Sequence, residues 1–174
     1  MKLTIRSERP ADLPTIETVT ACAFLNAPHS HHAEQHIVNA LRRAGALTIS
    51  LVAEAEASLI GHVAISPVSI SDGASGWFGL GPVSVLPQYQ RRSVGSQLTR
   101  AALQILRERG ASGCVVLGEP EYYGRFGFRA DPNLALAGVP AQYFQALPFD
   151  SSRPRGIVTY HDAFDVDGPA LTHT

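Results

Sequence analysis

The sequence predicts one α/β domain whose strands lie mainly in the middle of the chain. Its 174 residues suit a single hydrophobic core and leave little room for a second one. Hydrophobic residues make up 45% of the chain and charged residues 17%, the reverse of the balance in a disordered protein. Apolar residues recur at helical spacing near the N-terminus, change to strand-like runs in the middle, and return to helical spacing afterwards. We therefore take residues 1–174 as one folded domain.

A short strand and two helices are expected first. Residues 3–6 are rich in β-branched side chains, which favours a strand. One helix is expected from Asp12 to about Phe24, and another from about Ala33 to Ala44, closed by Gly45. The apolar residues at helical spacing in these two segments are Leu13, Ile16, Val19, Ala23, Ile37, Val38 and Leu41.

The middle of the chain predicts three strands, at residues 49–55, 58–70 and 77–85, the first two joined by a tight turn. Pro82 lies within the third strand and has no amide N–H for a sheet ladder. It therefore fits an edge, a strand end or a bulge, as in a strand that splays from its neighbour.

A long helix is expected next, because apolar residues from Val94 to Leu106 form one face and Gly110 closes it. A short buried strand, a short helix with a turn, and two closing strands are expected after it, at residues 113–118, 121–130, 141–149 and 156–164. The last ten residues are expected to be frayed.

Charge and composition exclude several classes of protein. A net charge of -1 gives no general attraction to nucleic acid or to an anionic membrane. No window approaches the roughly 20 apolar residues of a membrane-spanning helix, and the opening residues contain no apolar signal core. We therefore expect a cytoplasmic protein.

The two cysteines, Cys22 and Cys114, are too far apart in sequence to suggest a thiolate metal site or a disulfide scaffold. Cys114 lies in an apolar strand, where the thiol pKa is raised, and Cys22 lies near the apolar stripe of the first helix. Both are expected to pack in the core. The chain also lacks the Gly-x-Ser-x-Gly elbow of many hydrolases.

The most informative segment runs from a strand through residues 90–96 into the long helix. Successive backbone N–H groups at a helix N-terminus bind anions, and Arg91 and Arg92 add positive charge. Gly95 lets the backbone approach a ligand closely. The nucleoside-triphosphate loop Gly-x-x-x-x-Gly-Lys and the dinucleotide motif Gly-x-Gly-x-x-Gly are both absent. On spacing alone, a surface loop with solvated arginines is an equally good interpretation.

Three ordered motifs resemble the GNAT N-acetyltransferase superfamily. Residues 90–96 resemble its pyrophosphate loop Gln/Arg-x-x-Gly-x-Gly/Ala, and the preceding VSVLPQY resembles its fourth strand. YYGRFGF resembles its Tyr-x-x-x-Gly-Phe signature, and LTIRSERPADLPTI its first strand and helix. The combination is most similar to a bacterial YhbS-like branch. The resemblance runs from the first strand to about Ala130, with closing strands at about 140–165.

The resemblance implies a mixed, mostly antiparallel central sheet flanked by helices, with acetyl-CoA as the co-substrate and no metal. The implied coenzyme A residues are the backbone of Val83, Ser84 and Val85 and the loop residues Gln90, Arg91, Arg92, Ser93, Val94, Gly95 and Ser96. Ser93 departs from the family pattern, because it replaces the first glycine of the loop. A serine there costs little in the right-handed helical region, but coenzyme A affinity should fall if the position needs a positive φ.

Tyr123 matches the tyrosine of the family signature, which implies that it protonates the departing sulfur as a general acid. A packing aromatic whose hydroxyl reaches a carbonyl is the alternative. Its neighbour Tyr122 is a packing or substrate-wall residue that could substitute for it.

The general base has three candidates. Glu34 lies where the second helix of the family borders the acceptor site, Glu119 directly follows a strand, and His62 lies on a central strand. Each also has an ordinary structural explanation: a solvated helix residue, a helix N-terminal acid and a hydrogen-bonded strand histidine. We take Glu34 as the first candidate and keep the others open.

The histidine-rich segment contains His29, His31, His32 and His36, of which the last two have the i, i+4 spacing that can share a metal. The segment HAEQH lacks the Glu that directly follows the first His in the zinc-protease motif. An exposed polar turn near the acceptor entrance is therefore expected, with no metal site.

The sequence thus predicts an acetyl-CoA-dependent N-acetyltransferase that transfers an acetyl group to a primary amine of a small molecule or protein by direct attack in a ternary complex. A homodimer is compatible with the closing strands. The alternative is a non-catalytic acyl-CoA-binding or regulatory module on the same fold.

Overall fold

A computed structural model describes residues 1–28 and 30–165 of the chain. The helices are α1 (Leu13–Phe24), α2 (Glu34–Arg43), α3 (Val94–Glu108) and α4 (Pro120–Gly124). The strands are β1 (Leu3–Ser7), β2 (Ile49–Ala55), β3 (Ser58–Ile70), β4 (Trp77–Val85), β5 (Gly113–Leu117), β6 (Arg129–Ala130), β7 (Leu134–Leu136), β8 (Phe144–Pro148) and β9 (Gly156–Tyr160).

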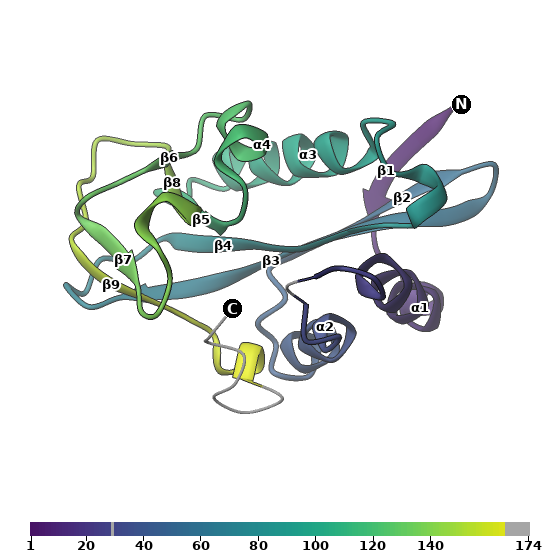
Figure 1. The fold of residues 1–174 in the computed structure, drawn as a ribbon, viewed down its shortest axis with the longest axis horizontal. Helices are drawn as coiled ribbons and strands as arrows, with labels where there is room; N and C mark the ends of the chain where they lie inside the picture. The colour runs from purple at the N-terminus through teal and green to yellow at the C-terminus, as the bar shows by residue number, and fades with distance from the viewer. Residues whose placement is uncertain (29, 166–174) are drawn as a thin grey trace.

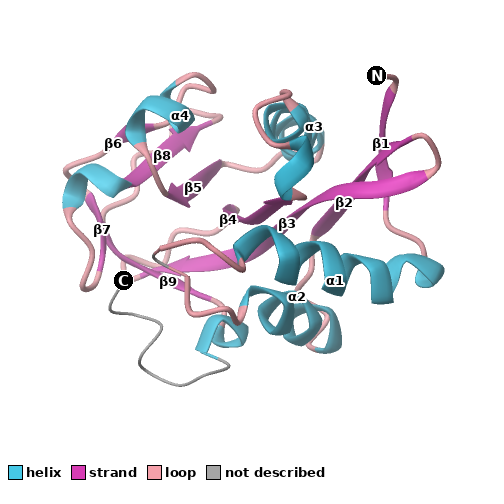
Figure 2. Ribbon diagram, turned by 45° about the vertical axis from the view of Figure 1, so that its right-hand side comes forward, coloured by secondary structure: helices cyan, strands magenta, loops and turns pink. Residues whose placement is uncertain are grey.

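The strands form one mixed and mostly antiparallel sheet in the order β1-β2-β3-β4-β5-β8-β6. Only β4 and β5 pair in parallel along this path, while β9 pairs with the far end of β3 and, in parallel, with β7. Figure 1 shows α3 and α4 on one face of the sheet and α1 and α2 on the other. Figure 2 shows the same layers turned, with α1 and α2 side by side. The predicted fold class is confirmed.

Two apolar layers hold the helices on the sheet. The apolar face of α3 buries Leu98, Ala102 and Leu106 against strand residues such as Val63 and Ile65. The apolar layer on the opposite face is smaller: a cluster of Ile16, Val38 and Val52 joins α1, α2 and β2 there. The helical spacing of the sequence therefore predicted the buried faces correctly.

The feature that positions the site is the separation of β4 from β5. These strands pair only from Trp77 opposite Gly113 to Gly79 opposite Val115. The register of β4 against β3 then shifts around Pro82, which lies in the resulting bulge, as the missing amide N–H predicted. Beyond the bulge β4 continues along β3 without β5, so one edge of its backbone is open.

The C-terminal part differs in detail from the prediction. Residues 141–143 form a 3-10 turn before β8, and residues 162–165 form another after β9, so a strand through 164 is wrong. The short strands β6 and β7 were not predicted, because segments of two and three residues carry no measurable periodicity. The expectation of a frayed C-terminus falls mainly on 166–174, outside the described residues.

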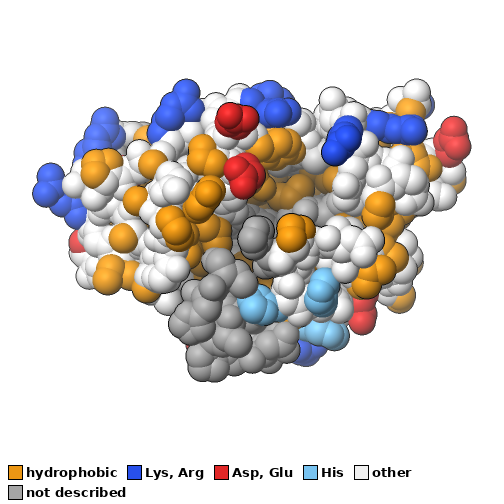
Figure 3. All heavy atoms as spheres, viewed as in Figure 1, with side chains coloured by type: hydrophobic (Ala, Val, Ile, Leu, Met, Phe, Trp, Pro, Cys, Tyr) orange, Lys and Arg blue, Asp and Glu red, His pale blue; other side chains and the backbone are white. Residues whose placement is uncertain are grey.

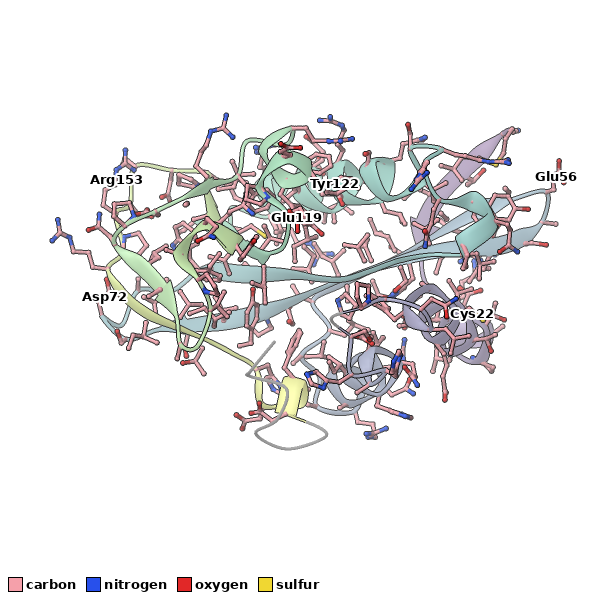
Figure 4. The ribbon with its side chains drawn as sticks, viewed as in Figure 1. Cys22, Glu56, Asp72, Glu119, Tyr122 and Arg153 are labelled. Carbon is pink, nitrogen blue, oxygen red and sulfur yellow. The ribbon has the colours of Figure 1, made fainter. Side chains whose placement is uncertain are left out.

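The two cysteines differ in burial. Cys114 is fully buried, and burial raises the pKa of its thiol, as expected. Cys22 is exposed on the outer side of α1, so the prediction that it packs in the core is wrong (Figure 4). It follows the buried Thr20 by two residues and therefore lies about 200° around the helix from it. Within the described residues, none of the helices combines the length and hydrophobicity needed to cross a membrane.

Candidate active site at the open edge of β4

A cavity of about 410 Å³ lies between the open edge of β4, the N-terminus of α3, and α4. It is lined by Val83, Val85, Tyr89, Gln90, Arg91, Ser93, Val94, Gly95, Ser96, Tyr122, Tyr123 and Arg125. The structure therefore brings most of the sequence-predicted donor loop and both candidate tyrosines to one cavity. That the loop binds coenzyme A stays a prediction at this point.

The loop before α3 lines this cavity and leads into the N-terminus of the helix. Arg91 and Ser93 both adopt left-handed backbone conformations, with φ of 64° and 66°. The N–H of Gln97 donates to the carbonyl of Ser93 at 3.0 Å, so the N–H groups of the residues between them precede the first intrahelical bond. In the part of the chain that the structure describes, this end of the helix has no side-chain cap hydrogen bond. These amides and the helix dipole form a site for an anion.

The φ of Ser93 decides between the two cases that the sequence left open. At 66°, the residue lies in the region where a Cβ costs about 1–2 kcal/mol and glycine costs nothing. The loop therefore keeps the glycine geometry with a serine in it, at the expense of stability.

The open edge of β4 offers backbone groups to a ligand. The N–H of Leu86 donates to the carbonyl of Ile60 on β3 at 2.9 Å. Because alternate residues of an antiparallel strand face the same neighbour, Ser84 also turns its backbone to β3, and Val83 and Val85 turn theirs to the open side. The side-chain amide of Gln90 donates to the Val85 carbonyl at 3.0 Å. The Val83 and Val85 N–H groups thus face the edge of β4 along which β5 does not pair.

Gly95 sets the width of the passage between α3 and β4. A Cβ on this residue would lie 3.0 Å from the hydroxyl oxygen of Tyr122 and 3.7 Å from a methyl carbon of Val85. A side chain at this position would therefore occupy the space through which a linear ligand must pass.

Positive charge lies at the rim of the cavity. Arg91 and Arg125 both line it, and the guanidinium of Arg125 lies 4.5 Å from the ring centroid of Tyr122. Arg92, which the sequence also indicated, is outside the lining and lies 5.8 Å from the ring centroid of Tyr89. Arg125 and Tyr89 were missed, because nothing in their spacing connects them with residues 90–96.

Tyr123 is held firmly on the α4 side of the cavity. Its ring packs against Gly118, where a Cβ would overlap it, and meets Phe128 edge to face at 6.0 Å. Burial raises its pKa to about 12, with smaller contributions from Tyr122 and Cys114. The hydroxyl therefore stays protonated at neutral pH, as a general acid must. Tyr122 packs edge to face on it and directs its own hydroxyl toward Gly95.

The three candidate bases lie outside the cavity lining. The Glu34 carboxylate accepts the proton of the Ser30 hydroxyl, whose oxygen lies 2.7 and 2.9 Å from its two oxygens. Glu119 is exposed at the N-terminus of α4, beside Tyr122 (Figure 4). His62 is fully buried on the α1 face of β3. The side of the molecule seen in Figure 3 is hollowed near its centre, with acidic side chains above the hollow and histidines below it.

The histidine-rich segment is exposed at His31, His32 and His36, as expected for a polar turn, and His29 lies outside the described residues. Among residues 1–28 and 30–165, no group of three or more His, Cys, Asp or Glu side chains is placed to hold a metal ion.

Comparison with known proteins identifies the family. The acetyltransferase (GNAT) domain model matches residues 4–130. A protein named the uncharacterized N-acetyltransferase YhbS, from Escherichia coli, is 38% identical over 168 residues, covering 92% of this chain and 98% of its own length.

Two crystal structures are similar over nearly the whole fold. A GNAT family acetyltransferase from Brucella melitensis, solved in complex with acetyl-CoA, is 48% identical with a TM-score of 0.85, covering 94% of this chain and 99% of its own. YhbS from Escherichia coli, solved in complex with CoA, has a TM-score of 0.87 at 32% identity, covering 97% of this chain and 94% of its own. This chain therefore belongs to the GNAT acetyltransferases.

Proposed function

We propose that this protein transfers the acetyl group of acetyl-CoA to a primary amine, of a small molecule or of a protein, by direct attack in a ternary complex. The observation that carries the proposal is the meeting of free helix amides, arginines and an open strand edge at one cavity of about 410 Å³. An anionic head joined to a linear arm fits that combination.

The residues present fit coenzyme A. The amides of the loop from Gln90 to Ser96, with Arg91 and Arg125, suit a pyrophosphate. The open edge at Val83 and Val85 suits an arm that pairs with backbone, and Gly95 leaves the passage free. The complexes of the two similar crystal structures with acetyl-CoA and CoA support this assignment.

Acetyl-CoA supplies an acyl group activated as a thioester. The N–H groups of Val83 and Val85 face the open edge and would stabilise the negative charge that develops on the carbonyl oxygen. Tyr123, whose pKa is raised to about 12 by burial, holds the proton that the departing sulfur needs.

Replacing Tyr123 by Phe tests the acid role. The change removes one hydroxyl and keeps the packing on Gly118 and Phe128, so folding should be unaffected. We expect kcat for thiol release to fall by roughly 10²-fold, with little change in KM for acetyl-CoA.

The matched control is Tyr122→Phe. The Tyr122 hydroxyl lies beside Gly95 in the passage, so its loss should change KM for acetyl-CoA more than kcat. An unchanged kcat in Tyr123→Phe would show that sulfur leaves without this acid.

A non-catalytic acyl-CoA-binding module is the second candidate. It stays open because none of the three candidate bases, Glu34, Glu119 and His62, lines the cavity, and because Ser93 replaces a glycine of the loop. Coenzyme A binding without thiol release in any amine screen, and no effect of Tyr123→Phe, would support the module.

A further inference from the structure

A chain of hydrogen-bonded polar groups runs under α1 and α2, on the face of the sheet opposite to α3. The Arg42 guanidinium donates to both oxygens of Glu8 at 2.8 and 3.0 Å. The Ser50 hydroxyl donates to Glu8 in a short hydrogen bond and lies 2.8 Å from Nε2 of His62. His62 is 0% exposed. None of these groups lines the cavity at the open edge of β4.

The chain fixes the tautomer of His62. An ionised carboxylate only accepts hydrogen bonds, so the single Ser50 proton points to Glu8. Ser50 must then accept from His62, which places the imidazole proton on Nε2. Nδ1 consequently keeps a free lone pair.

That lone pair is one of a group of buried polar atoms without a partner. Nδ1 of His62 and the hydroxyl oxygens of Ser84 and Thr20 have no hydrogen-bond partner among the described residues. Ser84 is directly opposite His62 in the register of β3 and β4. Thr20 follows Ile16 by one turn of α1, and Ile16 packs on Val52, the β2 partner of His62. Such atoms usually share a buried water, which makes about three hydrogen bonds.

The unpartnered atoms of His62 and Ser84 lie next to the proposed reaction site. Ser84 lies between Val83 and Val85, whose N–H groups face the open edge of β4, and its side chain points to the α1 face. The other end of the chain reaches solvent, because Glu8, Arg42 and Ser50 line a second cavity of about 300 Å³.

We propose that His62 takes up the proton released by the acceptor amine, through an internal water held by Nδ1 of His62, Ser84 and Thr20. Ser50 and Glu8 are positioning residues that keep the lone pair of Nδ1 directed to this water. The proposal rests on the proposed acetyl transfer and names the base for it.

The proton balance is simple. An N–H bond of the acceptor breaks as an O–H bond of the water forms, and the original water proton passes to Nδ1. The resulting imidazolium faces the ionised Glu8 through Ser50, and it returns the proton by the same path after the product leaves. No electron transfer is involved.

Burial, more than the charged groups around it, keeps the imidazole of His62 neutral at pH 7 and therefore free to accept a proton. Glu8 and Arg42 are the charged groups that act on it, while β2, β4 and α1 present Ser50, Ser84 and Thr20. Burial lowers the pKa of His62 to about 4, Glu8 raises it and Arg42 lowers it, so the imidazole is neutral at pH 7. Burial alone would raise the pKa of Glu8, but the hydrogen bonds from Arg42 and Ser50 outweigh it and keep the carboxylate ionised.

Two measurements on the unliganded protein test the site without any acceptor. A high-resolution crystal structure should show one water within hydrogen-bond distance of His62 Nδ1, Ser84 and Thr20. ¹⁵N NMR of the imidazole should show a neutral Nε2–H tautomer at pH 7 that changes in Ser50→Ala. A dry site, or a proton on Nδ1 at pH 7, would overturn the proposal.

Kinetics test the role, using acetyl-CoA and the amine that the wild-type protein acetylates fastest in a thiol-release screen. Ser50→Ala and Glu8→Gln should lower the rate at pH 7 by roughly 10-fold or more. Their deficit should shrink as the pH approaches the pKa of the amine, because the amine then arrives already deprotonated. The midpoint rise with acetyl-CoA should stay unchanged.

Ser66→Ala is the matched control, because Ser66 is a buried serine on the neighbouring strand β3 and lies outside the hydrogen-bonded chain. It should leave the rate and its pH dependence unchanged. A deficit in Ser50→Ala that is equal at every pH, or one matched by Ser66→Ala, contradicts the proton role. A wild-type protein that releases no thiol with any amine contradicts the proposed function instead.

Discussion

Ser93 holds the loop before α3 in a conformation that its own side chain disfavours. Its φ of 66° and the φ of 64° at Arg91 give the loop a backbone conformation of the kind that can present amides to an anion. The strain is therefore located where the anion site is formed, and a glycine would give the same geometry without it.

Ser93→Gly should raise the free energy of unfolding. Relief of a left-handed penalty of about 1–2 kcal/mol exceeds the roughly 0.5–1 kcal/mol that the greater freedom of glycine costs in the unfolded chain. We expect a gain of up to about 1 kcal/mol in urea denaturation, with coenzyme A affinity equal or higher.

Ser96→Gly is the control, because Ser96 lies in the first turn of α3 and has no positive φ. It should lose up to about 1 kcal/mol. If both variants are destabilised alike, the left-handed strain at Ser93 is not a cost to the protein.

At the residue scale, the sequence places the members of a contiguous motif together, while their binding of coenzyme A stays a prediction. The seven residues from Gln90 to Ser96 follow one another in the chain, so finding the motif was enough to locate the loop. The chain from Glu8 through Ser50 to His62 joins residues 42 and 12 positions apart, and no local pattern indicates it. His62 was considered from sequence, but the groups that orient it were not. The prediction that Cys22 packs in the core was wrong, because this residue lies at the margin of a short apolar stripe.

At the scale of elements, the N-terminus of α3 and the open edge of β4 line the cavity together, and Gly95 leaves the space between them open. Gly95→Ala should leave stability unchanged or slightly higher, because alanine favours helices more than glycine by about 1 kcal/mol. Coenzyme A affinity should nevertheless fall at least 10-fold, since the added Cβ would lie 3.0 Å from the Tyr122 hydroxyl oxygen and fill the passage.

Calorimetric titration with coenzyme A and thermal denaturation check these two effects separately. Tight binding by a well-folded Gly95→Ala protein would show that the ligand takes another route.

The connection from β1 to α1 depends on Asp12, which accepts hydrogen bonds from Arg6 at 2.8 and 3.0 Å and from the N–H of Arg9 at 2.6 Å. The hydrogen bond from Arg6 lowers the pKa of Asp12 to about 2. Its contribution to stability is therefore complete above its ordinary pKa, near 4, and is lost as the pH falls through about 2.

Asp12→Asn should consequently be less stable than the wild type at pH 7, by on the order of 1–2 kcal/mol. The difference should narrow as the pH is lowered from about 4 to about 2. Urea denaturation across this range measures it, and a difference independent of pH would mean that packing, rather than charge, is lost.

An element could be predicted from the sequence where its apolar pattern repeats over a long segment. The three longest strands, β2, β3 and β4, and the helices α1 and α3 have clear spacing, and their limits agree with the sequence closely. The residues after β9 alternate like a strand but form a 3-10 turn, because pairing partners end at Tyr160. Strand order depends on contacts between distant residues and was not predicted, whereas the mixed, mostly antiparallel sheet followed from the family resemblance rather than from spacing.

Across the whole molecule, the sheet separates two kinds of environment. The α3 and α4 face holds the helix amides, the arginines and Tyr123, while the α1 and α2 face holds the buried chain that ends at His62 (Figure 1). β4 belongs to both, because Val83 and Val85 line the cavity and Ser84 points the other way. This arrangement suits a reaction in which donor and acceptor meet across one strand edge.

The central claim is that the cavity at the open edge of β4 binds acetyl-CoA, and thermal unfolding with and without ligand tests it most directly. At about 100 times the dissociation constant, acetyl-CoA or coenzyme A should add roughly 2.7 kcal/mol and raise the midpoint by about 5–11 °C. ATP should have much less effect, because it lacks the arm that pairs with β4. In Gly95→Ala, a 10-fold loss of affinity should reduce the rise with coenzyme A at the same concentration to about half, and a greater loss should reduce it further. No rise in the wild-type protein at millimolar acetyl-CoA, or an equal rise in Gly95→Ala, would contradict the account.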